Sequence, residues 1–167
     1  GARVQPDWLY AFLRAPITIR PWLNVRMPTF GLDDVALNGA IRYFGAISNT
    51  VGPFQTHQIV RAANTEAAGK QMFETFQCQK CHVLGAIPKD QPTDNLAPDL
   101  RMASDRLNPD WIVQWLKSPL EILPGTKMPG FWPVGEKSPF PQLGGDGDAQ
   151  VRAIRDYLLT FRGGPGP

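Results

Sequence analysis

Two cysteines and a histidine fall close together in the segment Cys78-Gln79-Lys80-Cys81-His82. Thiols at this spacing lie about one helical turn apart, so both can add to the vinyl groups of a single haem. A histidine directly after the second cysteine then lies beneath the iron and can bind it. The motif therefore predicts covalent attachment of one haem through Cys78 and Cys81, with His82 as an iron ligand.

Three other uses of these residues compete with haem attachment. A structural zinc site needs four ligands, so His57 would have to complete the motif, and the adjacent Cys81 and His82 are awkward ligands for one tetrahedral ion. A thioredoxin-like redox pair needs a βαβ context, whereas the flanking sequence has helical patterns. A simple disulfide is also disfavoured at this short spacing.

A second iron ligand is available in the segment Lys127-Met128-Pro129-Gly130. A haem with histidine on one face commonly binds a methionine thioether on the other, which raises the reduction potential. We therefore predict Met128 as the second axial ligand, against the alternative that it fills the core. His57, the other histidine, would give a bis-histidine haem, but its place in a linker favours a solvated side chain.

The predicted ligands lie among three predicted helices, over residues 65–76, 108–117 and 148–161. Thr65 and Asn108 are suitable N-caps, and a proline after position 117 predicts the end of the second helix. In the last helix Val151, Ile154, Leu158 and Phe161 form one apolar stripe. A non-helical stretch, residues 96–100, precedes the second helix. The pattern predicts an all-α fold.

The composition narrows the possible functions. The chain has 167 residues, 17 prolines and 16 glycines, which indicates short helices joined by turn-rich loops. A net charge of +2 without a basic run gives no sign of nucleic-acid binding. No apolar run approaches the roughly 20 residues of a membrane span. The opening Gly1-Ala2-Arg3 does not resemble a signal peptide, so we expect a mature or trimmed chain.

Residues 62–163 resemble a class I c-type cytochrome. The resemblance rests on the helix with Gly69 and Phe73, the Cys78–His82 motif, the Pro98 loop, the Met128 loop, and the helices with Trp111 and Tyr157. It implies the class I cytochrome c fold, short helices wrapped around one covalently bound haem c. The family usually has glycine before this proline, and Ala97 is a mild departure.

The resemblance also implies roles for particular residues. Gly69 and Phe73 are expected to pack against Tyr157, and the Pro98 carbonyl is expected to hold the second ring nitrogen of His82. Candidates for the dry wall of the haem site are Trp115, Leu116, Phe131 and Trp132, and candidates for neutralising haem propionates are Arg101, Arg106 and Lys127. Attachment of such a haem implies a periplasmic or extracytoplasmic location in a bacterium.

The beginning of the chain repeats the second half of this segment. Pro6-Asp7-Trp8 matches Pro109-Asp110-Trp111, Arg26-Met27-Pro28 matches Lys127-Met128-Pro129, and residues 37–47 match residues 151–161. Such repetition indicates a second copy of the same structural unit. We therefore expect the C-terminal half of a cytochrome c-like domain in residues 1–50, a linker in 51–61 and a complete monohaem domain in 62–163.

The repeat lacks an attachment motif of its own, and this raises two possibilities. The chain is a piece of a larger multihaem protein, the interpretation we favour, or residues 1–50 are a degenerate domain that lost its haem. Met27 is then left without a haem in its own half-domain, although a domain-swapped neighbour could supply one. We expect Trp8, Phe12, Trp22 and Phe44 to be exposed and to favour a homodimer or another contact through residues 1–50.

These features predict one-electron transfer between redox partner proteins, without enzymatic activity of the chain itself. An iron bound by both His82 and Met128 has no open position for a substrate. The alternatives are a haem enzyme or ligand-binding module with an open iron, such as a peroxidase-like domain, and a docking domain of a larger redox complex.

Overall fold

The computed structural model describes residues 1–49, 65–87, 89–90, 92–133 and 136–167. These residues form α-helices and short 3₁₀ helices, and the only β pairing among them is three isolated bridges, which confirms the all-α prediction. None of the described helices is both long and apolar enough to cross a membrane. The predicted linker 51–61, with His57, lies outside the described residues.

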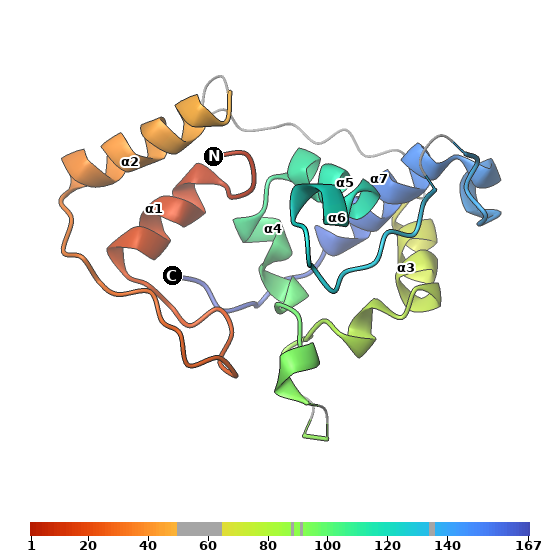
Figure 1. The fold of residues 1–167 in the computed structure, drawn as a ribbon, viewed down its shortest axis with the longest axis horizontal. Helices are drawn as coiled ribbons and strands as arrows, with labels where there is room; N and C mark the ends of the chain where they lie inside the picture. The colour runs from red at the N-terminus through yellow and green to blue at the C-terminus, as the bar shows by residue number, and fades with distance from the viewer. Residues whose placement is uncertain (50–64, 88, 91, 134–135) are drawn as a thin grey trace. The chain divides into compact units, whose positions relative to one another are not determined.

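The described residues group into two compact units, each considered by itself (Figure 1). The first unit comprises residues 1–49, 79–108 and 161–167, and the second comprises residues 65–78 and 109–160. This grouping cuts across the division into 1–50, 51–61 and 62–163, which stays a prediction.

Two helices dominate the first unit, α1 (Pro6–Arg14) and α2 (Asp34–Ile47). Pro6 suits the first turn of α1, and Asp33 caps α2 by accepting a hydrogen bond from the Ala36 N–H at 2.8 Å. Leu37 and Ile41 lie on the buried face of α2. The same unit contains the 3₁₀ helix η3 (Leu100–Met102) and the short helix α4 (Ala103–Arg106).

Four helices form the second unit: α3 (Thr65–Thr75), α5 (Pro109–Lys117), α6 (Pro119–Ile122) and α7 (Gly147–Leu158). The unit also contains the 3₁₀ helix η4 (Gln142–Gly145). Helix α7 packs against both α3 and α5 (Figure 1). The boundaries differ from the prediction in two places. Helix α7 ends three residues early because Leu159 and Thr160 form a turn, and Pro119 does not only end α5 but also begins α6.

The predicted contact of Gly69 and Phe73 with Tyr157 is confirmed. The Phe73 and Tyr157 rings meet edge to face with their centroids 5.4 Å apart. A β-carbon on Gly69 would collide with the Ala153 carbonyl and would lie 3.0 Å from the Tyr157 Cβ. Glycine is therefore needed here because the backbones of α3 and α7 approach so closely.

The predicted repeat has a structural counterpart in two helix pairs, α1 with α2 and α5 with α7. Helices α1 and α5 have the same length and begin at the matching prolines. Arg14, near the end of α1, pairs with Asp34 of α2 at 2.7 Å. Lys117, at the end of α5, pairs with Asp148 of α7 at 2.6 Å. The matched residues thus form the same ion pair in each unit.

The prediction that Trp8 is exposed is wrong. The Trp8 side chain is only 8% exposed, because it stacks on Phe12 at a centroid distance of 4.9 Å and the Arg106 guanidinium covers its ring. Phe12 and Trp22 are half-buried, also against the prediction, whereas Phe44 is exposed, as predicted. The exposed apolar residues between positions 1 and 49 include Val25, Phe30, Val35, Tyr43 and Ile47.

Candidate haem site

The attachment motif follows directly after helix α3. Gln77 adopts a left-handed conformation with φ of 55°, which ends the helix, and the Gln77 N–H donates to the Glu74 carbonyl at 3.0 Å. The 3₁₀ helix η1 (Cys78–Lys80) then forms one tight turn. Cys78 is half-buried and Cys81 is exposed. A turn between the thiols fits the spacing that attachment to one haem needs.

His82 is held by a short ladder within the first unit. The Ala97 N–H donates to the Cys81 carbonyl at 2.7 Å, and the Leu100 N–H donates to the Val83 carbonyl at 3.0 Å. Between these two bonds, His82 Nδ1 lies 2.9 Å from the Pro98 carbonyl oxygen. The contact expected between His82 and Pro98 is confirmed. Because a carbonyl only accepts, Nδ1 carries the proton and Nε2 remains for a metal.

The surroundings of His82 favour its neutral form, which is the form that binds a metal. Burial lowers the pKa of His82, the hydrogen bond to Pro98 raises it by less, and the positive charge of Arg20 lowers it further.

An ion pair between the buried Asp99 and the half-buried Arg101 lies at the end of the same ladder. Asp99 is 8% exposed and accepts two bonds from the Arg101 guanidinium, of which the shorter measures 2.8 Å. The carboxylate also accepts the N–H groups of Arg101 at 2.9 Å and Gly85 at 3.2 Å. Burial raises the pKa of Asp99, but these bonds outweigh it and hold the pKa below its usual value. Arg101, predicted to face a propionate, is thus bound to Asp99.

The other two predicted propionate partners lie in different surroundings. Arg106 belongs to the first unit, where its guanidinium carbon lies 5.1 Å from the centre of the Trp8 ring. Burial lowers the pKa of Arg106 to about 10, and the charges of Arg3 and Arg20 add to the effect. Lys127 belongs to the second unit and is exposed. Their predicted contact with propionates stays a prediction.

Met128 lies in an irregular loop of the second unit. Its side chain is half-buried, and its N–H donates to Thr126 Oγ1 at 3.3 Å, which supports the turn that precedes it. Met27, the matching residue of the first unit, is 40% exposed. The Arg26 side chain donates to three carbonyls of the preceding loop, those of Pro21, Leu23 and Val25. Both methionines are therefore on ordered loops.

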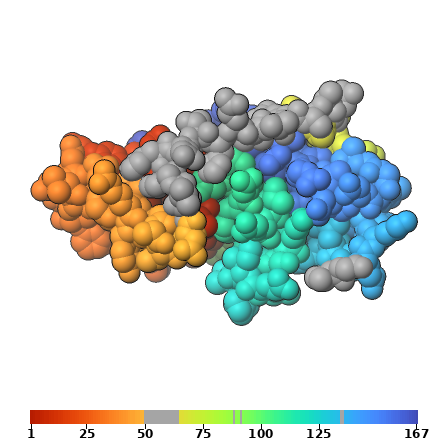
Figure 2. All heavy atoms as spheres, turned by 90° about the horizontal axis from the view of Figure 1, so that it is seen from above, coloured from red at the N-terminus to blue at the C-terminus, as the bar shows by residue number. Residues whose placement is uncertain are grey.

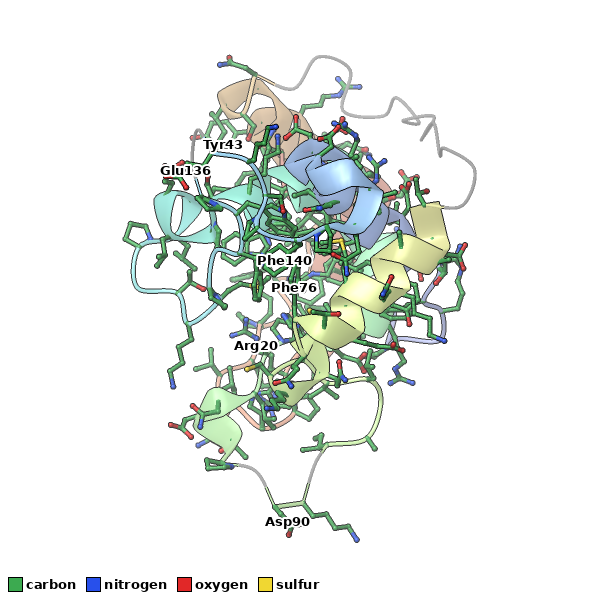
Figure 3. All side chains as sticks on the ribbon, turned by 90° about the vertical axis from the view of Figure 1, so that its right-hand side faces the viewer. Arg20, Tyr43, Phe76, Asp90, Glu136 and Phe140 are labelled. Atoms are coloured by element: carbon green, nitrogen blue, oxygen red, sulfur yellow. The ribbon has the colours of Figure 1, made fainter. Side chains whose placement is uncertain are left out.

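Three of the four predicted wall residues join aromatic groups of the second unit. Phe131 stacks on Phe76 at a centroid distance of 4.3 Å, and Trp132 meets the edge of Phe76 at 5.4 Å. Phe140 lies 4.6 Å from the same ring, as can be followed from the labels in Figure 3. Trp115 stacks instead on Trp111 at 5.3 Å. Phe76 precedes Cys78 by two residues, and both belong to the second unit, so the cluster is near the first cysteine of the motif.

Sequence reasoning missed Gln150, which positions Trp132. The Gln150 side chain is fully buried, and its Oε1 accepts the Trp132 indole N–H at 2.9 Å and the Ser138 hydroxyl at 2.5 Å. Its Nε2 donates to the carbonyls of Phe140 at 2.8 Å and Gln142 at 2.6 Å. The only signal in the sequence is a polar residue next to the buried stripe of α7.

Comparison with protein-family models, with curated proteins and with solved structures finds no match. Taken by type, and each within its own unit, the donors are those that a covalently bound haem uses. They are two thiols separated by one turn, an imidazole with one nitrogen already bonded, and a thioether on an ordered loop. Across the described part of the chain, no three His, Cys, Asp or Glu side chains come together as a metal-binding group. The zinc alternative depends on His57 and stays untested.

Proposed function

We propose that the chain is an electron-transfer protein that binds one haem covalently through Cys78 and Cys81, with His82 and Met128 as iron ligands. The observation that supports this most is the bond between His82 Nδ1 and the Pro98 carbonyl at 2.9 Å. A disulfide has no need for a histidine oriented in this way, and a structural zinc ion would need His57 as its fourth ligand. A bound haem supplies a ferric/ferrous couple that accepts and releases a single electron.

The residues of the chain have distinct parts in this proposal. The Pro98 carbonyl fixes the His82 tautomer and increases the electron donation of the imidazole, because it accepts the Nδ1 proton. The ladder of Cys81 with Ala97 and of Val83 with Leu100 fixes the backbone on both sides of His82, and the bond to Pro98 orients the ring. A fixed histidine keeps the same geometry in both oxidation states of the iron. This lowers the reorganisation energy of electron transfer.

Phe131, Trp132 and Met128 affect the reduction potential of the same haem. Phe131 and Trp132 offer apolar surface that excludes water, and Gln150 holds the Trp132 indole in one orientation. A dry environment disfavours the more highly charged oxidation state, and a thioether ligand also favours the reduced iron. Together they support a reduction potential suited to transfer between proteins.

Attachment is tested by producing the chain in cells that attach haem to exported proteins. The intact mass of the purified chain should exceed the polypeptide mass by that of one haem, and the haem should remain bound after acid–acetone extraction. Cys78→Ala and Cys81→Ala should each leave one thioether bond, and the double variant should release the haem. A chain that carries zinc, or no added mass, would contradict the proposal.

Electron transfer is tested on the same material. The oxidised and reduced spectra should interconvert reversibly with one electron per chain, and neither cyanide nor carbon monoxide should alter them at modest concentration. His82→Ala should open the iron to both ligands, whereas His57→Gln should behave as the wild type. Ready binding of carbon monoxide by the wild type would favour the alternative of a haem enzyme or ligand-binding module.

A further inference from the structure

Helices α2 and α7 occupy the same place in the two halves of the repeat, but their surroundings differ. Each follows a Met-Pro loop and forms the matching ion pair with the helix that begins Pro-Asp-Trp, Asp34 with Arg14 of α1 and Asp148 with Lys117 of α5. With the ion pair as a guide, Gly39, Arg42 and Tyr43 of α2 correspond to Ala153, Asp156 and Tyr157 of α7.

In the second unit, helix α3 covers this face of α7. Ala153 is fully buried because Gly69 of α3 lies against its carbonyl, and Tyr157 meets the ring of Phe73. At the far end of the face, Asp156 is 2% exposed and accepts a hydrogen bond from the Thr65 hydroxyl at 3.1 Å. The face is thus contacted by residues spaced four apart along α3.

In the first unit, the same face of α2 is open. A β-carbon on Gly39 would meet nothing within 4 Å, Tyr43 is 62% exposed and Arg42 is exposed. Val35, one turn before Gly39, is 81% exposed. Figure 2 shows atoms of α2, in orange, at the surface of the molecule. The opposite face of α2, with Leu37 and Ile41, is buried, whereas the described residues place nothing within 4 Å of a β-carbon on Gly39.

We propose that the Val35, Gly39, Arg42 and Tyr43 face of α2 binds an amphipathic helix of the α3 type, with a glycine against Gly39 and an aromatic residue four positions later against Tyr43. The occupant is defined by the pair α3 and α7, because the same positions of the repeat would make the same contacts. Glycine on both helices allows an approach at least as close as that of Gly69 to Ala153.

Charge distinguishes this occupant from α3 itself. Arg42 replaces Asp156, the residue that accepts the Thr65 hydroxyl in the second unit. A hydroxyl would leave the Arg42 guanidinium without a carboxylate, whereas aspartate or glutamate at the Thr65 position would pair with it. We therefore expect an acidic residue four positions before the glycine. This inference does not depend on haem binding.

The test uses the full chain and synthetic peptides of residues 65–77 with a photo-crosslinking group in place of Phe73. The peptide with Thr65→Glu should crosslink to α2, and the chain should bind it about two- to fivefold more tightly than the peptide with Thr65→Lys, as an exposed ion pair would give. The Arg42→Glu chain should reverse that preference. Affinities are measured by fluorescence anisotropy, and the crosslinks are located by mass spectrometry.

Two matched controls separate docking from unspecific adhesion. The Gly39→Leu chain, whose helix content is checked by circular dichroism, should lose at least about tenfold in affinity because the new side chain occupies the contact. A peptide that adds Gly69→Leu should fail in the same way. No binding of either peptide, crosslinks on α7, an unchanged preference in Arg42→Glu, or self-association of the chain through α2 would each overturn the proposal.

Discussion

The helix pairs α1–α2 and α5–α7 form the same local structure from matching residues, but only one of them is enclosed. Both begin with Pro-Asp-Trp, and both tryptophans are nearly buried, Trp8 at 8% and Trp111 at 9% exposure. The second helix of each pair differs, because Ala153 of α7 is fully buried whereas Gly39 of α2 has open space beside it. The presence of α3 explains this difference.

The comparison shows which properties are local and which depend on a third element. The length of the first helix, an aspartate cap on the second helix and the ion pair between the two helices recur without α3, so none of these features requires it. Burial on two sides and the need for glycine at a crossing appear only where α3 is packed. Substitutions at matched positions can therefore separate the two kinds of effect.

The largest loss of stability is expected for substitutions at the matched tryptophans, which are nearly buried in both helix pairs. Trp8→Ala and Trp111→Ala should each lower the free energy of unfolding by about 3–5 kcal/mol, because each removes a large buried ring. Urea unfolding followed by circular dichroism measures both. A loss of less than about 1 kcal/mol for Trp8→Ala would show that α1 does not pack as α5 does.

The next largest change in stability is expected at the glycines on the face of the second helix, which is covered by α3 in one pair and open in the other. Gly69→Ala should destabilise the chain by about 3 kcal/mol, because its β-carbon would collide with the Ala153 backbone. The same substitution at Gly39 should instead stabilise α2 by about 0.5–1 kcal/mol, since the site is open and alanine favours a helix. Equal effects at the two glycines would contradict the comparison.

A smaller effect is expected at the ladder that holds His82, a segment without a matching copy in residues 1–49. Asp99→Asn should cost about 1–3 kcal/mol, because Arg101 and Gly85 lose a buried charged acceptor. The control Asp90→Asn, at an exposed position, should be neutral.

The same aspartate gives a defined pH dependence. Because the pKa of folded Asp99 lies below its usual value, its contribution to stability is complete above the ordinary Asp pKa of about 3.9 and is lost as the pH falls through the lowered value. Unfolding measured between neutral and acidic pH should therefore be less acid-dependent in Asp99→Asn. An unchanged acid dependence would show that the Asp99 carboxylate is not stabilised as described.

The smallest effect is expected at the two equivalent ion pairs. The Tyr10 hydroxyl and Arg14 lower the pKa of Asp34, and the Lys117 ammonium lowers that of Asp148. Asp148→Asn should cost less than about 1 kcal/mol, since the pair is largely exposed, and Asp34→Asn should have a similarly small effect. Salt should reduce both differences. A large loss at one position only would show that the pairs are not equivalent.

Much of the fold follows from local patterns in the sequence. Thr65 at the start of α3, Pro109 at the start of α5 and the stripe with Val151 and Ile154 predicted the helices nearly where they lie. The His82–Pro98 contact and the Gly69 crossing followed from family resemblance, because no local pattern specifies which distant segments meet.

Other features depend on tertiary contacts that the sequence does not display. Trp8 was predicted to be exposed because residues 1–50 were expected to form half of a domain, but Arg106 covers its ring. A glutamine such as Gln150 is usually found at the surface. In this structure its side chain is buried and makes four hydrogen bonds, which hold Trp132 and the loop that contains it. In the first case the partner, Arg106, is distant in the sequence. In the second case a polar side chain is buried because its hydrogen bonds are all satisfied.

The two methionine loops allow the central claim, a haem bound by His82 and Met128, to be tested directly. The oxidised protein should show the methionine–iron charge-transfer band in its visible spectrum, recorded on wild type, Met128→Leu and Met27→Leu prepared alike. We predict that the band persists in Met27→Leu and disappears in Met128→Leu, which should also bind carbon monoxide when reduced. A band that survives Met128→Leu, or that is lost in Met27→Leu, would contradict the assignment.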